Sequence, residues 1–128
     1  MYANTGYLWG ADVDEERTDI LLAVVSCGNY KLRKMPVLKT VRPYGRKDYQ
    51  MMYVASGIVY YMEENRQHTA LAVSLILFPP NIPQNYMYYR EEQTEVYWVH
   101  FTGNRAEDTA REVFGGGNAA CVLPVGRS

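Results

Sequence analysis

Short apolar segments separated by turn-forming residues run along most of this chain of 128 residues. Residues 75–78 and 95–101 are two such segments, rich in aliphatic, β-branched and aromatic side chains, which favour strands. Between them Pro79-Pro80 ends the first strand, because proline has no backbone N–H to donate to a sheet. The same kind of pattern predicts further strands over residues 20–27, 37–41, 49–55, 58–62, 68–74 and 86–89.

The segment 95–101 carries aromatic residues on both of its faces. Successive side chains of a strand point to opposite sides, so Val96, Trp98 and His100 share one face, and the odd-numbered residues share the other. A strand of this kind is either covered on both sides, or packed on one side while the other side lines a pocket.

One helix is predicted near the C-terminus. Asn104 is followed three residues later by Glu107, which is the spacing of a capping box. We expect the helix to end at Phe114, before three consecutive glycines. About eight short strands and one helix, joined by Gly, Pro and Asn turns, are typical of an all-β jelly roll or barrel, and the pattern alone does not distinguish the two.

Length and composition restrict the domain organisation. A chain of this length forms one domain with a single core. Residues 1–17 are polar and acidic and are expected to form an N-terminal arm outside the barrel, whereas residues 18–128 form the globular domain. Cys27 and Cys121 lack the spacing of metal ligands and are expected to be buried free thiols.

Charge and hydropathy exclude two classes of partner. The net charge is −1 and the basic residues between positions 31 and 47 are spread over several predicted elements, so direct binding to nucleic acid is disfavoured. We expect these basic residues on solvated faces, with Arg42 as the exception discussed below. No run reaches the ~18 apolar residues of a membrane span and no signal peptide is evident, which indicates a cytoplasmic protein without membrane contact.

Five short motifs occur in the order and with the approximate spacing found in one family. They are residues 42–45 (RPYG), 48–50 (DYQ), 56–57 (SG), 78–83 (FPPNIP) and 97–103 (YWVHFTG). Together they resemble the N-terminal, effector-sensing domain of AraC-type transcription regulators, over roughly residues 20–126. The resemblance implies a cupin-like double-stranded β-helix, which is a jelly-roll barrel, with one short C-terminal helix.

Enzymes of the cupin fold typically hold a metal ion through several histidines and a carboxylate. This chain has only His68 and His100, and position 84, often histidine in relatives, is Gln84. An amide is a poor ligand for transition metals compared with imidazole. The sequence also lacks a Gly-x-Ser-x-Gly motif and a phosphate-binding loop. We therefore expect no metal, no cofactor and no catalytic residue; a small metal-dependent cupin isomerase or dioxygenase is the alternative.

The resemblance implies a binding pocket. Arg42, Tyr86 and Trp98 occupy positions that contact sugar in the arabinose regulator after which the family is named. Val96 falls where that regulator has a further contacting histidine, so the effector expected here is a small polar molecule, sugar or sugar-like, other than arabinose. Trp9 is expected near the pocket mouth, because the arm of that regulator folds over its sugar. The competing interpretations are core packing for Trp98 and a surface ion pair for Arg42.

The resemblance also implies partners outside this chain. In the family the sensing domain is followed by dimerisation helices and by helix-turn-helix motifs that read DNA, and neither pattern occurs in this sequence. We expect a homodimeric regulator that reaches DNA only through a missing C-terminal domain, with the effector controlling DNA binding. A dimerisation module without a ligand is a further possibility.

Overall fold

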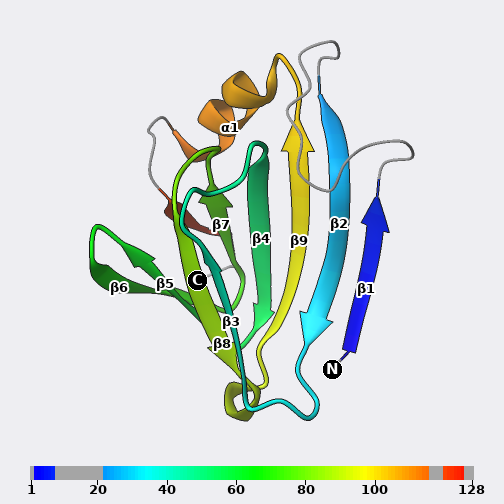
Figure 1. The fold of residues 1–128 in the computed structure, drawn as a ribbon, viewed down its shortest axis with the longest axis vertical. Helices are drawn as coiled ribbons and strands as arrows, with labels where there is room; N and C mark the ends of the chain where they lie inside the picture. Colours follow the sequence, from blue (N-terminus) through cyan, green and yellow to red (C-terminus); the bar gives the residue numbers. More distant parts are fainter. Residues whose placement is uncertain (1, 8–21, 116–119, 126–128) are drawn as a thin grey trace.

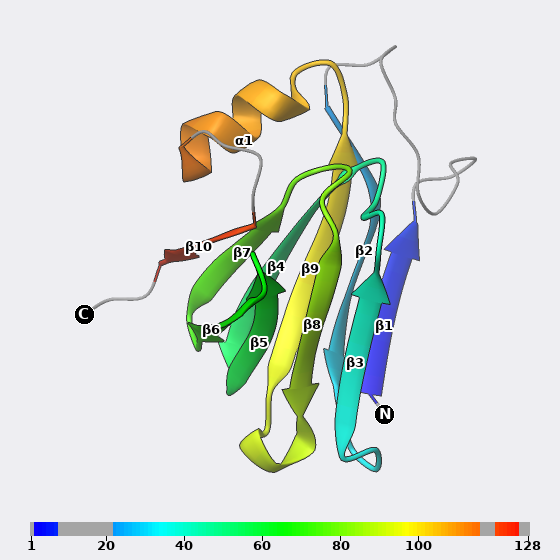
Figure 2. The same ribbon diagram turned by 60° about the vertical axis from the view of Figure 1, so that its left-hand side comes forward.

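The computed structural model describes residues 2–7, 22–115 and 120–125, and these form two antiparallel β-sheets that face each other (Figures 1 and 2). The larger sheet contains β1 (Tyr2–Tyr7), β2 (Ala23–Lys31), β4 (Tyr49–Ser56), β7 (Ser74–Phe78), β9 (Glu95–Thr102) and β10 (Cys121–Pro124). The smaller sheet contains β3 (Val37–Arg42), β5 (Ile58–Glu63), β6 (Arg66–Leu71) and β8 (Gln84–Tyr89). A 3₁₀ turn, η1 (Arg90–Glu92), joins β8 to β9, and one helix, α1 (Ala106–Phe114), follows β9.

The strand order shows the jelly-roll arrangement. It is β1-β2-β9-β4-β7-β10 in the larger sheet and β3-β8-β5-β6 in the smaller one. Every strand pair is antiparallel, and neighbours such as β2 and β9 are far apart in sequence. The all-β class, the jelly-roll arrangement and the single short helix predicted from the sequence are confirmed.

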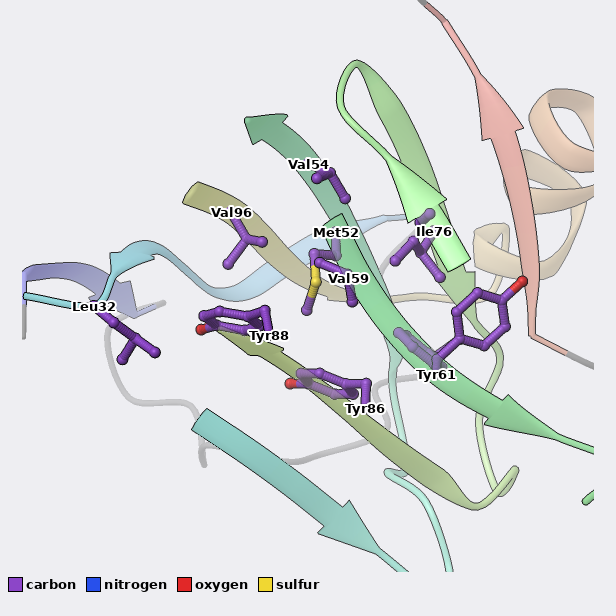
Figure 3. Close-up of a cluster of buried hydrophobic side chains, with 11 residues drawn as sticks. Leu32, Met52, Val54, Val59, Tyr61, Ile76, Tyr86, Tyr88 and Val96 are labelled. Carbon is purple, nitrogen blue, oxygen red and sulfur yellow. The ribbon is translucent and has the colours of Figure 1, made fainter. Parts of the chain in front are cut away.

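The main core lies between the two sheets, on the inward faces of their strands. β4 shows the pattern clearly, because Gln50, Met52 and Val54 are buried while the residues between them are only half-buried. Figure 3 shows Tyr86 and Tyr88 side by side along β8, facing Met52 and Val96 of the other sheet. The buried cluster comprises Leu32, Met52, Val54, Val59, Tyr61, Ala70, Ile76, Phe78, Tyr86, Tyr88 and Val96.

Helix α1 covers part of the outer face of the larger sheet. Ala106 and Ala110 of the helix are buried against Phe101 of β9 and Leu77 of β7. Tyr49 of β4 stacks on Phe101 with ring centroids 5.2 Å apart. The C-terminal part of the outward face of β9, Val99 and Phe101, is thus packed beneath the helix, while Val96 and His100 are buried on the inward face, which confirms the two-faced character predicted for residues 95–101.

The bounds of several elements differ from the prediction. The strand predicted over residues 68–74 is wrong in its C-terminal part, because β6 ends at Leu71 and the next strand, β7, begins at Ser74, with Val73 at a φ of +64° between them. β2 continues beyond residue 27 to Lys31, because Gly28 and Asn29 pair with Trp98 and Tyr97 of β9 and the ladder outweighs their local preference for a turn. Helix α1 ends at Phe114 as predicted, but its N-cap residue is Arg105, which makes no side-chain capping bond, and not Asn104 as predicted.

The N-terminal segment also differs from the predicted arm. Its residues Tyr2–Tyr7 form β1, which pairs with β2 at the edge of the larger sheet. An edge strand presents unpaired N–H and C=O groups, and β1 satisfies those of β2. Trp9 and the acidic residues of the predicted arm lie outside the described residues. Cys27 is exposed and Cys121 is half-buried, so the prediction of two buried thiols is wrong.

Candidate functional site

A cavity of about 280 Å³ lies between the inward faces of β2, β3, β4, β8 and β9. Its volume is close to the lower limit of about 300 Å³ that is usual for small-molecule pockets, so a small ligand fits it. The lining residues are Ser26, Tyr30, Leu38, Thr40, Arg42, Arg46, Gln50, Met52, Tyr86, Tyr88, Val96, Trp98 and His100.

Strand register brings four of the five predicted site residues to this cavity. Arg42 lies opposite Gln84, at the end of β3 that pairs with the start of β8. Trp98 of β9, which lines the cavity, lies opposite Gly28 of β2. Tyr86 and Val96 also line the cavity, whereas Trp9 lies outside the described residues. Direct contact of these residues with a ligand stays a prediction.

Trp98 and Tyr30 form the aromatic wall of the cavity. Their rings meet edge to face, with centroids 5.0 Å apart and an interplanar angle of 81°. Trp98 is only half-buried and belongs to neither buried cluster, so core packing does not account for it.

A network of neutral side chains holds Arg42 at the polar end of the cavity. Its Nη1 donates to Oε1 of Gln84 at 2.7 Å and to Oε1 of Gln50 at 3.4 Å. Gln50 in turn donates from Nε2 to the hydroxyl of Tyr86 at 3.2 Å. Arg42 has no carboxylate partner in the part of the chain that the structure describes, so the surface ion pair considered from the sequence does not occur there.

His100 completes the network from β9. Its Nε2 lies 3.3 Å from Oε1 of Gln50, and its Nδ1 lies 2.6 Å from Oγ of Ser26. Since Gln50 offers an acceptor here, Nε2 carries the proton and Nδ1 accepts from the Ser26 hydroxyl. Burial, followed by the charges of Arg46 and Arg42, lowers the pKa of His100 to about 3. The imidazole is therefore neutral at pH 7 and serves as a fixed wall of the site.

Arg46 and Asp48 form a buried ion pair beside the cavity. Nε of Arg46 lies 2.7 Å from Oδ1 of Asp48, and Nη2 lies 2.9 Å from Oδ2, so the pair is bidentate. Arg46 is only 5% exposed and lines the cavity, which corrects the prediction that it lies on a solvated face. The Asp48 carboxylate offsets the charge that such burial otherwise leaves unpaired.

The family model for the AraC-like ligand binding domain matches residues 33–125, which is most of the chain. This chain belongs to the AraC-like ligand-binding domain family. The resemblance noted on five short motifs is therefore confirmed. A comparison of this chain with curated proteins finds no match.

Solved structures share the fold of the AraC-like domain. YhaK from Escherichia coli has a TM-score of 0.62 and 10% identity, with 99% of this chain and 52% of that chain covered. Wild-type ToxT from Vibrio cholerae, solved with bound unsaturated fatty acid, has a TM-score of 0.55 and 14% identity, with 88% of this chain and 44% of that chain covered. The AraC-like domain thus spans about half the length of each, and the cupin-like fold expected from the sequence is confirmed.

Two further features of the AraC-like domain concern metal binding and membranes. Across residues 2–7, 22–115 and 120–125, no group of three or more His, Cys, Asp and Glu side chains is placed to hold a metal ion. In the same ranges, no helix has both the length and the apolar character needed to cross a membrane.

The lining residues that were not predicted as site residues include four polar side chains of the network and ion pair described above: Ser26, Arg46, Gln50 and His100. The sequence held a signal for three of them. Gln50 and His100 lie within the family motifs, and Arg46 stands two residues before Asp48, a spacing that suits a paired charge. Ser26 gave no signal, because its role depends on a hydrogen bond to a residue 74 positions away.

Lowering the pH from 6.5 to 5 is expected to destabilise the AraC-like domain through His100. The unfolded histidine takes up a proton near its ordinary pKa of about 6.5, whereas the folded one stays neutral until about pH 3. The unfolded state then binds more protons, so the free energy of unfolding falls by up to about 1.4 kcal/mol per pH unit. Urea denaturation at several pH values measures this slope.

The variant His100→Gln separates this contribution from other titrating groups. We expect it to flatten the slope between pH 6.5 and 5, whereas His68→Gln, which removes the other histidine of the chain, retains it. Equal slopes in the His100→Gln variant and the parent protein contradict the assignment of His100 as a buried neutral histidine.

Proposed function

We propose that this AraC-like domain is the effector-sensing domain of a transcription regulator, and that a small polar molecule, sugar or sugar-like, binds in its cavity. The observation that carries the proposal is the meeting of Arg42 and Trp98, from two facing sheets, in one cavity of about 280 Å³. A small polar ligand needs an aromatic surface and a few directed hydrogen bonds, and this cavity supplies both.

Each predicted contact has a chemical role in this proposal. The guanidinium of Arg42 donates a forked pair of hydrogen bonds to hydroxyl or carboxylate oxygens. Trp98 stacks on the apolar face of the ligand. Tyr86, held by Gln50, closes the opposite wall, and Val96 fills the space beneath. None of these roles requires a bond to be broken, so the domain binds its effector without transforming it.

Effector binding then controls DNA binding by shifting a population of conformations. A ligand shifts such an equilibrium only by its difference in affinity for the two states. β2 provides a physical connection, because it lines the cavity through Ser26 and Tyr30 and pairs with β1 along its other edge. In the proposed cytoplasmic homodimer, the N-terminal segment or the dimer contacts respond, and a helix-turn-helix domain beyond this chain engages DNA.

The variants Arg42→Ala and Trp98→Ala, each placed in the intact regulator, test the proposal. We expect Arg42→Ala to weaken the response to effector by about 10–100-fold, because hydrogen bonds from a charged group are lost. We expect Trp98→Ala to weaken it by about tenfold, because an aromatic contact is lost. The effector is found first by thermal-shift screening of sugars, sugar acids and other small metabolites, because a ligand that binds only the native state raises Tm.

Tyr97→Ala is the matched control. Tyr97 is the sequence neighbour of Trp98 on the opposite face of β9, where its side chain is 47% exposed. We expect this variant to keep the effector response. An unchanged response in both the Arg42 and the Trp98 variants removes the cavity from the mechanism.

A further inference from the structure

The charges around the polar end of the cavity do not balance. Two arginines, Arg42 and Arg46, line the cavity, and among the described residues no Asp or Glu lines it. Asp48 lies behind Arg46 and neutralises it through two hydrogen bonds of 2.7 and 2.9 Å. His100 is neutral at pH 7. One positive charge, that of Arg42, is therefore left without a compensating negative charge among the described residues.

The partners of Arg42 orient it without neutralising it. Both Gln84 and Gln50 accept from the same nitrogen, Nη1. A guanidinium has five N–H donors, and those on Nε and Nη2 have no partner in the described part of the chain. Gln84 is only 1% exposed and Gln50 is equally buried, so the two amides form a fixed support for Arg42.

A neutral ligand in this cavity leaves Arg42 in an unfavourable position. The ligand displaces water from a half-buried guanidinium and replaces its hydrogen bonds, but it supplies no negative charge. Burying an unpaired charge is costly in free energy. A carboxylate supplies one negative charge and two acceptor oxygens, whose spacing matches the forked N–H donors of the guanidinium. A doubly charged phosphate exceeds the one positive charge that is available.

We propose that the effector is a small monocarboxylic acid, a sugar acid or another compact acid, whose carboxylate pairs with Arg42 while its body lies against Trp98 and Tyr30. This inference rests on the proposed function and specifies the charge of the ligand. Gln84 and Gln50 act as positioning residues, because the amide oxygen of each accepts from Nη1 of Arg42 and so orients the guanidinium.

Matched pairs of acid and neutral probes test the inference. The probes are galacturonate with galactose, gluconate with glucitol, benzoate with benzamide, and cyclohexanecarboxylate with its amide, each titrated into the 128-residue chain by calorimetry and thermal shift. We expect at least one acid to bind, and to bind tenfold or more tightly than its neutral partner. In Arg42→Gln this preference disappears, because glutamine keeps hydrogen-bonding groups but lacks the charge.

Arg111→Gln is the control for net charge. Arg111 lies on α1, is 59% exposed, and pairs with Glu107 on the surface of the helix. This variant is expected to keep the preference for the acid. The inference is overturned if no acid binds, if neutral probes bind as tightly as their acids, or if Arg42→Gln retains the preference. Tight binding of a neutral sugar overturns only the inference and leaves the proposed function standing.

Discussion

Replacing Asp48 by Asn is expected to lower the free energy of unfolding by about 3–5 kcal/mol, because it removes one partner of a buried ion pair. The substitution keeps the shape of the side chain but leaves Arg46, which is only 5% exposed, without its compensating charge. Little water reaches a guanidinium at that depth, so the native state bears a large part of the desolvation penalty. Chemical denaturation at pH 7 measures the difference.

Glu107→Gln makes the same chemical change where burial is absent. Glu107 pairs with Arg111 one helical turn away, and the two side chains are 70% and 59% exposed. Exposed ion pairs contribute about 0–1 kcal/mol, so the control variant is expected to unfold within that range of the parent protein. A loss below about 1 kcal/mol in Asp48→Asn contradicts the role assigned to the buried pair.

Replacing Gly45 by Ala is expected to cost at least about 2 kcal/mol, the sum of backbone strain and overpacking. Gly45 has a φ of +72°, a region that residues with a side chain rarely adopt. A Cβ there meets the backbone of Ile82, with the amide nitrogen at 2.7 Å and the carbonyl oxygen closer still. Because these atoms belong to the backbone, they cannot move aside as a flexible side chain does. Thermal and urea denaturation measure the loss.

Gly115→Ala separates strain from steric contact. Gly115 has a φ of +90°, but a Cβ placed there meets nothing within 4 Å. Its substitution is expected to cost about 1–3 kcal/mol through backbone strain alone, and therefore less than the substitution of Gly45, which adds overpacking to the same strain. Similar losses at Gly45 and Gly115 contradict the claim that the close approach to Ile82 matters.

These two predictions concern the same part of the site. Gly45 donates its N–H to the carbonyl of Arg42 at 3.0 Å and closes the turn that follows β3. Asn81, which precedes Ile82, donates its N–H to the carbonyl of Arg46 at 2.8 Å. The turn that carries both arginines is thus fixed to the loop between β7 and β8, which leads into Gln84. The rigidity of this junction keeps Arg42 directed at the cavity.

The local pattern of apolar and polar residues was enough to predict most of the strands and one face of the cavity. The alternation in residues 95–101 placed Val96, Trp98 and His100 on a common face, and the structure turns that face toward the cavity. Periodicity is a property of consecutive residues, so it survives without tertiary information. Element ends were less predictable, since Gly28 prefers turns in isolation but lies within β2 when β9 pairs with it.

The sequence by itself determined the strands, their buried faces and the family, because each depends on residues close together in the chain or on short ordered motifs. Tertiary structure alone decided that Arg42 rests on Gln84, 42 residues away, and that His100 bonds to Ser26, 74 residues away. It also decided that Asp48 neutralises Arg46 and not Arg42. Such pairings depend on strand register between distant segments, and the unbalanced charge that selects the proposed ligand exists only once that register is set.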